Sequence, residues 1–344
     1  MKAILKQVLG IDVSQKELVV CLGRMNSDLS LDLYATKTFA NNPKGFDQLV
    51  SWRSKMTEPS LAVRFVMEAT GVYHEALAYF LDSKGLEVSI VLPNKISNFS
   101  RTLEVKTKTD KSDSEVIARF GLERKLDTWK KPRKIFRNLK QLTRERDQII
   151  QDRTVAKNQL HAEQTEAFPY ENSLNRVKDR IRLLNKQEAE IKKEIAALVK
   201  QDVAVSKSVD LICTIPGVAL LTAATVLGET NGFELIRNKR QLASYAGLDV
   251  REKESGTSIH GKARISKKGN RHLRKAMYLP ALAAIRFNER YKATFVRLVS
   301  RHGIKMKAAV AVQRKMLELI YVLYKNNTAY DKNYAGENRL FITT

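Results

Sequence analysis

The sequence predicts an α/β N-terminal domain, a helical coiled-coil segment and a mainly α-helical C-terminal domain. Three observations predict this order. Short apolar runs alternate with helical periodicity over the first hundred residues, a heptad-like pattern follows, and helical periodicity with turn residues fills the remainder. The length of 344 residues suits about two globular domains. We place the boundaries at 1–132, 133–205 and 206–330, followed by a polar tail at 331–344.

The first hundred residues are typical of a sheet with helices packed on it. Short apolar runs predict two strands within 8–22 and further strands at 34–39, 63–67 and 88–92. Apolar residues at helical spacing predict helices within 41–52 and over 71–84. Strands that alternate with helices predict an α/β sheet.

From Ile135 to about Lys200 the pattern becomes helical. One seam of residues recurs three and four apart, namely Leu174, Val177, Ile181, Leu184, Glu188, Ile191, Ile195 and Leu198. Such a seam, with Glu188 as its polar break, is typical of a coiled coil. Pro169 marks the bend of a helical hairpin. The segment is either an intramolecular arm or a dimer contact, and the periodicity does not choose between them.

The C-terminal part begins near Val209. A helix, a Pro-Gly turn and a second helix are predicted over 212–229, and two later helices over 272–287 and 305–325. A Gly- and Lys-rich loop precedes the later pair. The turn at 215–217 resembles a helix-hairpin-helix element, whose turn amides meet a DNA phosphate. A plain helical hairpin in a core is the alternative.

The formal charge of +24, from 61 Lys and Arg against 37 Asp and Glu, makes a polyanion the expected partner. Residues 1–100 hold 11 basic against 10 acidic side chains, residues 101–150 hold 15 against 8, and residues 251–320 hold 18 against 4. This distribution indicates a near-neutral scaffold with two localised polyanion-binding surfaces. A basic block that is only a solvated face is the alternative.

Several protein classes are excluded. Cys21 and Cys213 are too few for a disulfide framework, and neither has the spacing of a zinc site. No apolar run approaches the roughly 20 residues of a membrane span. The N-terminal apolar stretch is too short for a signal peptide. We therefore expect a soluble protein of a reducing compartment that has no membrane partner.

Four acids form the first candidate site. Asp12 interrupts one predicted strand and Glu68 ends another. Asp110 and Asp113 share one face at the start of a predicted helix. An acid inside an apolar run needs a cation, a metal or hydrogen bonds, and carboxylates are ligands that Mg²⁺ prefers. Taken singly, the acids also suit strand-end or first-turn positions. Three lysines lie around the last two acids, and we expect them to contact phosphates. They are Lys106, Lys108 and Lys111.

The second candidate site is the segment 245–274, where Ser255 stands among many cations. The predicted nucleic-acid-binding residues of this segment are Arg251, Lys262, Arg264, Lys267, Lys268, Arg271 and Arg274. A serine hydroxyl near phosphate and guanidinium groups can act as a nucleophile, because positive charge stabilises its alkoxide and the transition state. The alternative is a phosphate-binding loop whose serines only donate hydrogen bonds.

Five motifs in this order resemble those of the DEDD-type insertion-sequence transposases, the family that includes the Piv/MooV-like invertases: GIDVSQKEL, EATGVYHEAL, KTDKSDSEVIARF, IPGVALLTAA and YAGLDVREKESGTSIHGKARISKKGNRHLRKAMY. The resemblance implies an RNase H-like (RuvC-like) N-terminal domain whose acidic tetrad binds Mg²⁺ or Mn²⁺. Carried over by motif, this tetrad is Asp12, Glu68, Asp110 and Asp113. The serine nucleophile of the family falls on Ser255, and the family pattern alone prefers it to the neighbouring Thr257 and Ser258.

The resemblance also implies a prokaryotic, cytoplasmic and nucleoid-associated recombinase that cuts and rejoins DNA through a phosphoserine link. A structured bridge RNA would pair with donor and target DNA and thereby choose the sequence. The coiled-coil segment would serve oligomerisation into a dimer or tetramer. Since the acids and the serine belong to different domains, we hypothesise a composite site assembled from two protomers.

Two alternative functions stay open at this point. One is a RuvC-like endonuclease or junction resolvase that uses a metal-activated water and no covalent serine. The other is a non-enzymatic nucleic-acid-binding protein whose acids are turn residues.

Overall fold

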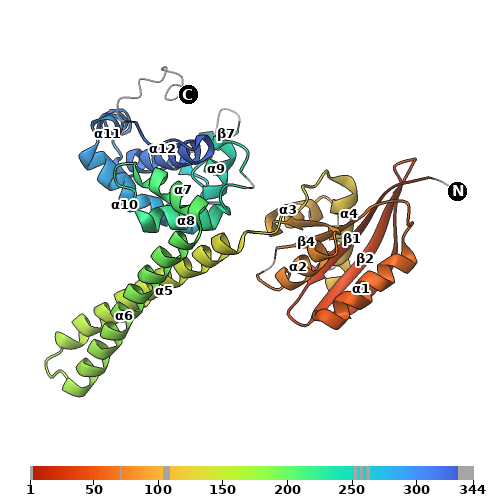
Figure 1. Cartoon of the computed structure of the whole chain (residues 1–344), viewed down its shortest axis with the longest axis horizontal. Coiled ribbons are helices and arrows are strands. Elements are labelled where there is room, and N and C mark those ends of the chain that lie inside the picture. The colour runs from red at the N-terminus through yellow and green to blue at the C-terminus, as the bar shows by residue number, and fades with distance from the viewer. Residues whose placement is uncertain are drawn as a thin grey trace. The chain divides into compact units, whose positions relative to one another are not determined.

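The computed structural model divides into two compact units, Met1–Lys131 and Pro132–Thr344 (Figure 1). It describes residues 3–69, 71–103, 109–234, 236–251 and 264–331, and the backbone of residues 254–255 and 259–260. Three predicted phosphate-binding residues lie outside the described residues, namely Lys106, Lys108 and Lys262. Among the helices described, none combines the length and the apolar character that crossing a bilayer requires.

The first unit is built on a five-stranded mixed sheet with the strand order β3-β2-β1-β4-β5. The strands are β1 (Ile4–Val13), β2 (Glu17–Asn26), β3 (Leu31–Ala40), β4 (Val63–Glu68) and β5 (Glu87–Val91). The first three strands pair antiparallel, while β4 pairs parallel with both β1 and β5. Every predicted strand of this part of the chain is present, and the mixed sheet fits the predicted RNase H-like fold.

Helices cover both faces of the sheet, namely α1 (Pro43–Met56), α2 (Glu75–Ser83), α3 (Pro93–Ser100) and α4 (Asp110–Glu123). Successive residues of a strand face opposite sides. Leu9 and Ile11 of β1 therefore pack in one core with residues of α1 and α2, while Val8 packs in a second core with residues of α3 and α4. Helix α2 begins four residues later than predicted, because residues 71–74 form turns.

The second unit begins with two long helices, α5 (Lys134–Gln164) and α6 (Glu171–Gln201), which lie side by side as a hairpin (Figure 1). The bend between them includes Pro169, as predicted. Most of the predicted apolar seam is buried, including Leu174, Val177, Leu184, Ile191 and Ile195. Glu188 of the seam is also buried, and Arg146 and Arg153 of α5 both bond to its carboxylate.

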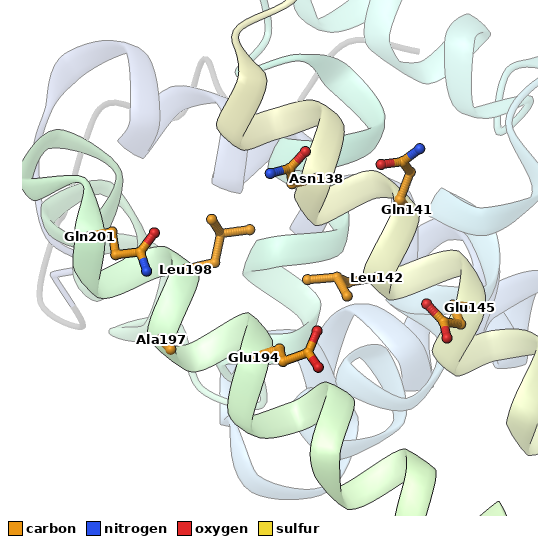
Figure 2. Close-up of a pocket in the computed structure, with 8 residues that line it drawn as sticks. All are labelled: Asn138, Gln141, Leu142, Glu145, Glu194, Ala197, Leu198 and Gln201. Atoms are coloured by element: carbon orange, nitrogen blue, oxygen red, sulfur yellow. The ribbon is translucent and has the colours of Figure 1, made fainter.

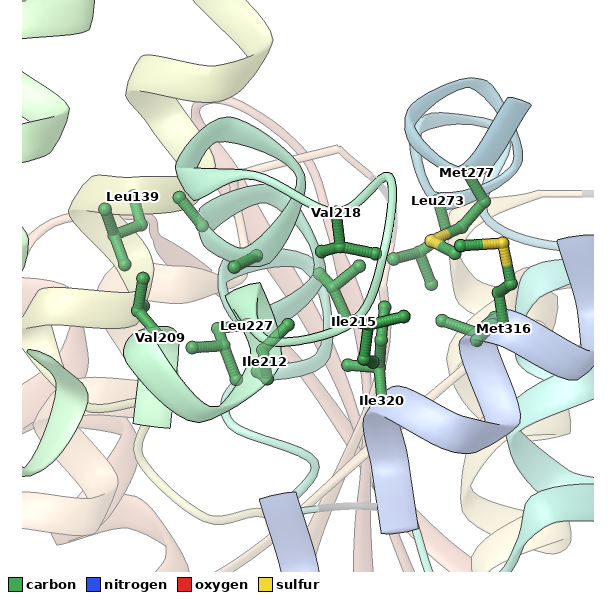
Figure 3. Packing of buried hydrophobic residues seen from close by; sticks show 14 of the residues in the cluster. Leu139, Val209, Ile212, Ile215, Val218, Leu227, Leu273, Met277, Met316 and Ile320 are labelled. Atoms are coloured by element: carbon green, nitrogen blue, oxygen red, sulfur yellow. The ribbon is translucent and has the colours of Figure 1, made fainter. Parts of the chain in front are cut away.

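The rest of the second unit is a helical domain. Its helices are α7 (Val203–Cys213), α8 (Leu220–Thr230), α9 (Lys239–Ala246), α10 (Arg271–Phe287), α11 (Glu289–His302) and α12 (Lys305–Asn326). Figure 3 shows their shared core, in which Leu139 of α5 lies in one buried cluster with Leu227 of α8, Met277 of α10 and Ile320 of α12.

Two features of this domain correct the sequence prediction. Helix α11 was not predicted, although its buried and half-buried apolar residues, Tyr291, Phe295, Leu298 and Val299, recur at helical spacing. The predicted Gly- and Lys-rich loop contains four two-residue strands, β6 (Val250–Arg251), β7 (Glu254–Ser255), β8 (Ile259–His260) and β9 (Arg264–Ile265). They form the antiparallel pairs β6–β9 and β7–β8.

The Pro-Gly turn between α7 and α8 packs on α10. A β-carbon on Gly217 would lie 2.9 Å from the carbonyl oxygen of Pro280, and Ile215 and Val218 beside it are buried. Gly217 also has a φ of +87°, which favours glycine. Gly217 itself is exposed, so both the plain helical hairpin and the helix-hairpin-helix fit this packing.

Candidate functional site

Helix α4 lies antiparallel along β1. At one end, the Lys6 Nζ of β1 donates to the carbonyl oxygens of Gly121 and Leu122, at 2.5 and 3.0 Å. In the middle, a β-carbon on Gly10 would lie 2.1 Å from the backbone nitrogen of Ala118. Because α4 and β1 run in opposite directions, Asp12, near the C-terminal end of β1, lies at the N-terminal end of α4.

The same reasoning places Glu68 beside Asp12. Ile11 of β1 pairs with Met67 of the parallel strand β4, so the next residues of the two strands are neighbours on the same face of the sheet. This is the face that α4 covers, because Asp12 shares it with Val8 and Gly10.

The first turn of α4 supplies the other two acids. Thr109 begins the helix with a capping box, in which its hydroxyl accepts from the backbone nitrogen of Ser112 at 3.2 Å and its own nitrogen donates to the Ser112 hydroxyl at 2.8 Å. Asp110 and Asp113 lie in this turn, where the partial positive charge of a helix N-terminus favours carboxylates. Asp110 is exposed, while Asp113 is partly buried.

The electrostatics agree with this placement of the four acids as neighbours. Burial raises the pKa of Asp12 to about 6, and the negative charges of Asp113, Asp110 and Glu68, in that order, contribute to the rise. In the described part of the chain Asp12 forms no ion pair. The folded protein therefore gathers negative charge at the end of β1 that a bound cation would relieve.

The donor set fits a divalent cation whose coordination shell is completed by substrate. No three Asp, Glu, His or Cys residues in the described ranges lie closely enough together to hold a metal ion by themselves. Mg²⁺ is usually held by one or two carboxylates, with waters and substrate phosphates as its other ligands. Asp12 with one or more of the neighbouring acids meets that requirement, and hard oxygen donors suit Mg²⁺ or Mn²⁺.

A cationic surface lies on the loop before α10 and on the short strands that precede it. Arg251 and Arg264 are directly opposite each other in the β6–β9 pair and are both exposed. Like charges directly opposite each other destabilise a strand pair. Such a pair of exposed arginines is typical of a surface that binds anions. The other exposed cations are Lys267, Lys268 and Arg271, and Lys111 is exposed on α4 in the first unit.

Ser255 lies in the short strand β7, where its backbone pairs with that of Ile259 in β8. The side chain of Ser255 is outside what the structure describes. Thr257 and Ser258 are outside the described residues altogether. The structure thus places the backbone of the predicted nucleophile on the strand pair that follows Arg251.

Arg274 points inward. Its Nη1 donates to the carbonyl oxygens of Ala246 and Gly269, at 2.7 and 3.2 Å, and burial lowers the pKa of Arg274. The backbone nitrogen of Lys267 donates to the carbonyl oxygen of Gly247 at 3.1 Å. These bonds fasten the turn between β9 and α10 onto the end of α9, so Arg274 supports the turn that bears the exposed cations.

Sequence reasoning missed one buried group of this domain. The side chain of Glu229 is fully buried at the end of α8, where it accepts hydrogen bonds from Arg144 and Asn270. An acid at the end of an apolar helix gives no sign of burial in the sequence, because its cation lies 85 residues earlier in the chain.

A groove of about 560 Å³ lies between α5 and α6 (Figure 2). Its lining residues are Asn138, Gln141, Leu142, Glu145, Glu194, Ala197, Leu198 and Gln201. None of the predicted site residues lines it. The candidate chemistry therefore lies at the acids of the first unit and the cationic loop of the second, not in this groove.

Comparison with known proteins identifies the family of the chain. A transposase family model for DEDD-type IS110 proteins matches residues 9–169, and a model described as transposase IS116/IS110/IS902 family matches residues 209–296. The pilin gene-inverting protein of Moraxella bovis is 30% identical over 334 residues, which cover 95% of this chain and 98% of that protein. The transposase for insertion sequence element IS1111A of Coxiella burnetii is 23% identical, covering 77% of this chain and 78% of that protein.

Among solved structures, the RuvC structure of Thermus thermophilus matches with a TM-score of 0.28 and 11% identity, covering 36% of this chain and 99% of that one. The match to the Moraxella bovis protein extends over nearly the whole of both chains, and the two transposase models match successive parts of this one. The chain therefore belongs to the IS110 family of transposases.

Proposed function

We propose that this transposase cuts and rejoins DNA through a covalent phosphoserine link at Ser255, with a divalent metal held by Asp12, Glu68, Asp110 and Asp113. The observation that carries the proposal is the gathering of the four acids at one end of β1 and α4, where burial and mutual repulsion raise the pKa of Asp12 to about 6. Such a group of carboxylates is costly unless a cation binds it.

Mg²⁺ or Mn²⁺ is the cofactor that fits these oxygen donors. When bound, it would offset the negative charge that develops on the attacking and leaving oxygens of a phosphodiester. The acids themselves must be ionised to hold it, so Asp12 has to lose its proton first. The proposal therefore predicts that metal affinity rises with pH around the pKa of Asp12.

The serine step conserves the energy of the phosphodiester. The Ser255 hydroxyl gives its proton to solvent, and its oxygen forms a bond to the phosphorus. The bond from phosphorus to the leaving sugar oxygen breaks, and that oxygen takes up a proton from solvent to become a hydroxyl. A sugar hydroxyl of a new DNA partner then attacks the phosphoserine and releases the serine. The same exchange serves transposition or inversion, and a relative of this chain is named a pilin gene-inverting protein.

The cationic surface would hold the nucleic acid. Arg251 and Arg264 are exposed on β6 and β9, and Lys267, Lys268 and Arg271 are exposed between β9 and the start of α10. Such side chains bind phosphates irrespective of sequence. Sequence choice would then come from a structured bridge RNA that pairs with donor and target DNA. Because the acids and Ser255 belong to different units, we propose that the active form is a homo-oligomer in which both act on one phosphodiester.

Two variants with matched controls test the chemistry. Wild-type protein incubated with guide RNA, donor DNA and Mg²⁺ should form a protein–DNA adduct that survives denaturation. Ser255→Ala should abolish this adduct, whereas Ser258→Ala should retain it. Asp12→Asn should form no adduct while it still binds DNA and RNA.

The rival enzyme is a nuclease that uses an activated water. Cleavage by Ser255→Ala at the wild-type rate would establish that rival and overturn the serine mechanism. Full recombination by Asp12→Asn would overturn the role of the acids. Recombination that proceeds equally well without RNA would overturn the guided part of the proposal.

A further inference from the structure

Glu229 is a buried carboxylate that the proposed chemistry does not use. Its side chain has 0% exposure. The Arg144 Nε of α5 donates to its Oε1 at 2.6 Å and the Nη2 to its Oε2 at 2.9 Å. The Asn270 Nδ2 donates to the same Oε2 at 2.6 Å. A buried charge with such partners fixes their positions, because the loss of one leaves it uncompensated.

Asn270 is the N-cap of α10, and both the oxygen and the nitrogen of its side-chain amide form hydrogen bonds. Its Oδ1 accepts from the backbone nitrogens of His272 and Leu273, at 2.9 and 3.2 Å, while its Nδ2 donates to Glu229. Its own backbone nitrogen donates to the carbonyl oxygen of Tyr245 at 2.8 Å. The Tyr245 hydroxyl in turn donates to the backbone carbonyl oxygen of Glu229 at 2.9 Å, so the network closes on itself.

The turn that Asn270 fixes is the one that bears the exposed cations. In the sequence, Lys267 and Lys268 come shortly before Asn270, and Arg271 directly follows it. A β-carbon on Gly269 would lie 2.5 Å from the carbonyl oxygen of Tyr245, so the turn packs backbone to backbone on α9. The positions of these cations thus depend on one buried amide.

Helix α5 holds the same region at a second point. Asp147, one turn after Arg144, lies 3.1 Å from the Lys275 Nζ and 3.4 Å from the His272 Nδ1, both in the first turns of α10. Next to Glu229, a β-carbon on Gly228 would lie 2.8 Å from the backbone nitrogen of Lys140, so α5 and α8 also meet backbone to backbone. One face of α5 therefore contacts both the end of α8 and the start of α10.

We propose that Glu229 is a positioning residue that couples helix α5 of the hairpin to the cationic turn 267–271. Arg144 on α5 orients the Glu229 carboxylate, the carboxylate orients Asn270, and Asn270 holds the turn in the conformation that binds a phosphate backbone. Glu229 does not contact nucleic acid in this arrangement. The proposal rests on the proposed function of the turn as a phosphate-binding surface.

Two conservative variants break the coupling, and each has a matched control. Glu229→Gln weakens the Arg144 link, and its control is Glu318→Gln, which changes an Arg–Glu pair on α12 with Arg314 Nε at 2.8 Å. Asn270→Asp keeps the helix cap but puts a carboxylate against Glu229. Its control is Asn288→Asp, since Asn288 caps α11 in the same way while its Nδ2 faces the Tyr330 hydroxyl at 3.2 Å.

The first measurement is amide hydrogen exchange of the full-length protein without nucleic acid. We expect Glu229→Gln and Asn270→Asp to speed exchange in residues 267–274 by about tenfold or more while the buried part of α12 is unchanged. The controls should leave residues 267–274 at the wild-type rate. Equal exchange in variants and controls, or a uniform rise throughout the second unit, would overturn the proposal.

The second measurement is binding to a random-sequence DNA duplex and to a structured RNA of equal length over a range of salt concentration. We expect both coupling variants to reduce the slope of log affinity against log salt by about 1 to 2, since each lost phosphate contact removes about 0.9. Faster exchange with an unchanged slope would overturn the coupling to phosphate binding. A triple variant of Lys267, Lys268 and Arg271 to Ala separates this from failure of the proposed function, because an unchanged slope there would show that the turn does not bind phosphates.

Discussion

A β-carbon on Gly10 would lie 2.1 Å from the backbone nitrogen of Ala118, so β1 and α4 touch backbone to backbone at this point. A second close approach lies one turn along the helix, where a β-carbon on Gly121 would lie 2.7 Å from a methyl group of Val8. The two glycines set α4 antiparallel on β1. They thereby bring the first turn of the helix to Asp12.

We predict that Gly10→Ala is far more costly than its single methyl group suggests. The methyl group has no space unless the helix moves, so we expect a loss of about 3 kcal/mol or more in the free energy of unfolding. Gly85→Ala is the matched control, because Gly85 has a φ of +68° but no atom within 4 Å of the position that a β-carbon would take; about 1 kcal/mol of backbone strain is expected there. Urea unfolding measures both, and an equal cost would contradict the tight helix–strand contact.

Replacing Asp12 by Asn should stabilise the metal-free protein at neutral pH. Burial and three neighbouring acids raise the pKa of Asp12 from 3.8 to about 6 in the folded state. The folded state therefore binds the Asp12 proton more tightly than the unfolded state does. The stabilisation of the folded state by this proton is complete below pH 3.8 and is lost as the pH rises through 6. In EDTA we expect the free energy of unfolding of Asp12→Asn to exceed that of the wild type by about 2 kcal/mol at pH 7.5, after allowance for solvent screening. Near pH 4 the two free energies should differ little.

Divalent metal should reverse that order. Mg²⁺ or Mn²⁺ that binds only the folded state raises the melting temperature of the wild type with increasing concentration, while Asp12→Asn should respond much less. Thermal melts at pH 7.5 across a metal titration would show this. Wild-type and variant curves that coincide with and without metal would be evidence against a metal site at Asp12.

Much of the first unit could be predicted from its sequence, because the alternation in β1 separates two buried faces. Leu9 and Ile11 belong to one core and Val8 to the other, which is the period of two that strands require. Helix α11 was missed although its sequence has the helical period, with Tyr291, Phe295 and Leu298 on one face. The short strands of the cationic loop are two residues long, too short to show any period.

The candidate site was predictable residue by residue but not as an arrangement. Asp12 inside an apolar strand is visible in the sequence, and its raised pKa reflects the cost of placing a carboxylate there. Its closeness to Asp113 depends on the direction in which α4 crosses β1, which local patterns do not specify. Glu229 was missed for the same reason, because its partner Arg144 is brought to it by tertiary packing alone.

Glu188 should stabilise the hairpin in a pH-dependent way. Burial by itself would raise the pKa of Glu188, but hydrogen bonds from Lys192 and Arg153 and the charge of Arg146 lower it to about 2. Its contribution is thus complete above pH 4.5 and is lost as the pH falls toward 2. We expect Glu188→Gln to cost about 2 kcal/mol at pH 7, since a mostly buried carboxylate loses its ion pairs, and less at pH 3.

Glu190→Gln is the control for this prediction. It lies on the same helix, its side chain is 54% exposed, and the nearest cation, the Lys186 Nζ, is 3.9 Å away. Exposed pairs of this kind contribute less than about 0.5 kcal/mol. If chemical unfolding at pH 7 gave the two variants the same stability, the buried ion pairs of Glu188 would not be what holds α5 against α6.

Arg251 should favour nucleic-acid binding at the expense of stability. It faces Arg264 across the β6–β9 pair, and like charges directly opposite each other destabilise such a pair by up to about 1 kcal/mol. We therefore expect Arg251→Gln to leave stability unchanged or slightly raised. The slope of log DNA affinity against log salt should fall by about 0.9, because one phosphate contact is lost.

The matched control is Arg182→Gln on α6, whose side chain is 76% exposed and pairs with Asp179. Equal slopes for the two variants would mean that the cationic strands do not bind the phosphate backbone. A lower slope for Arg251→Gln alone would mean that the opposed arginines are kept for nucleic acid and not for the fold.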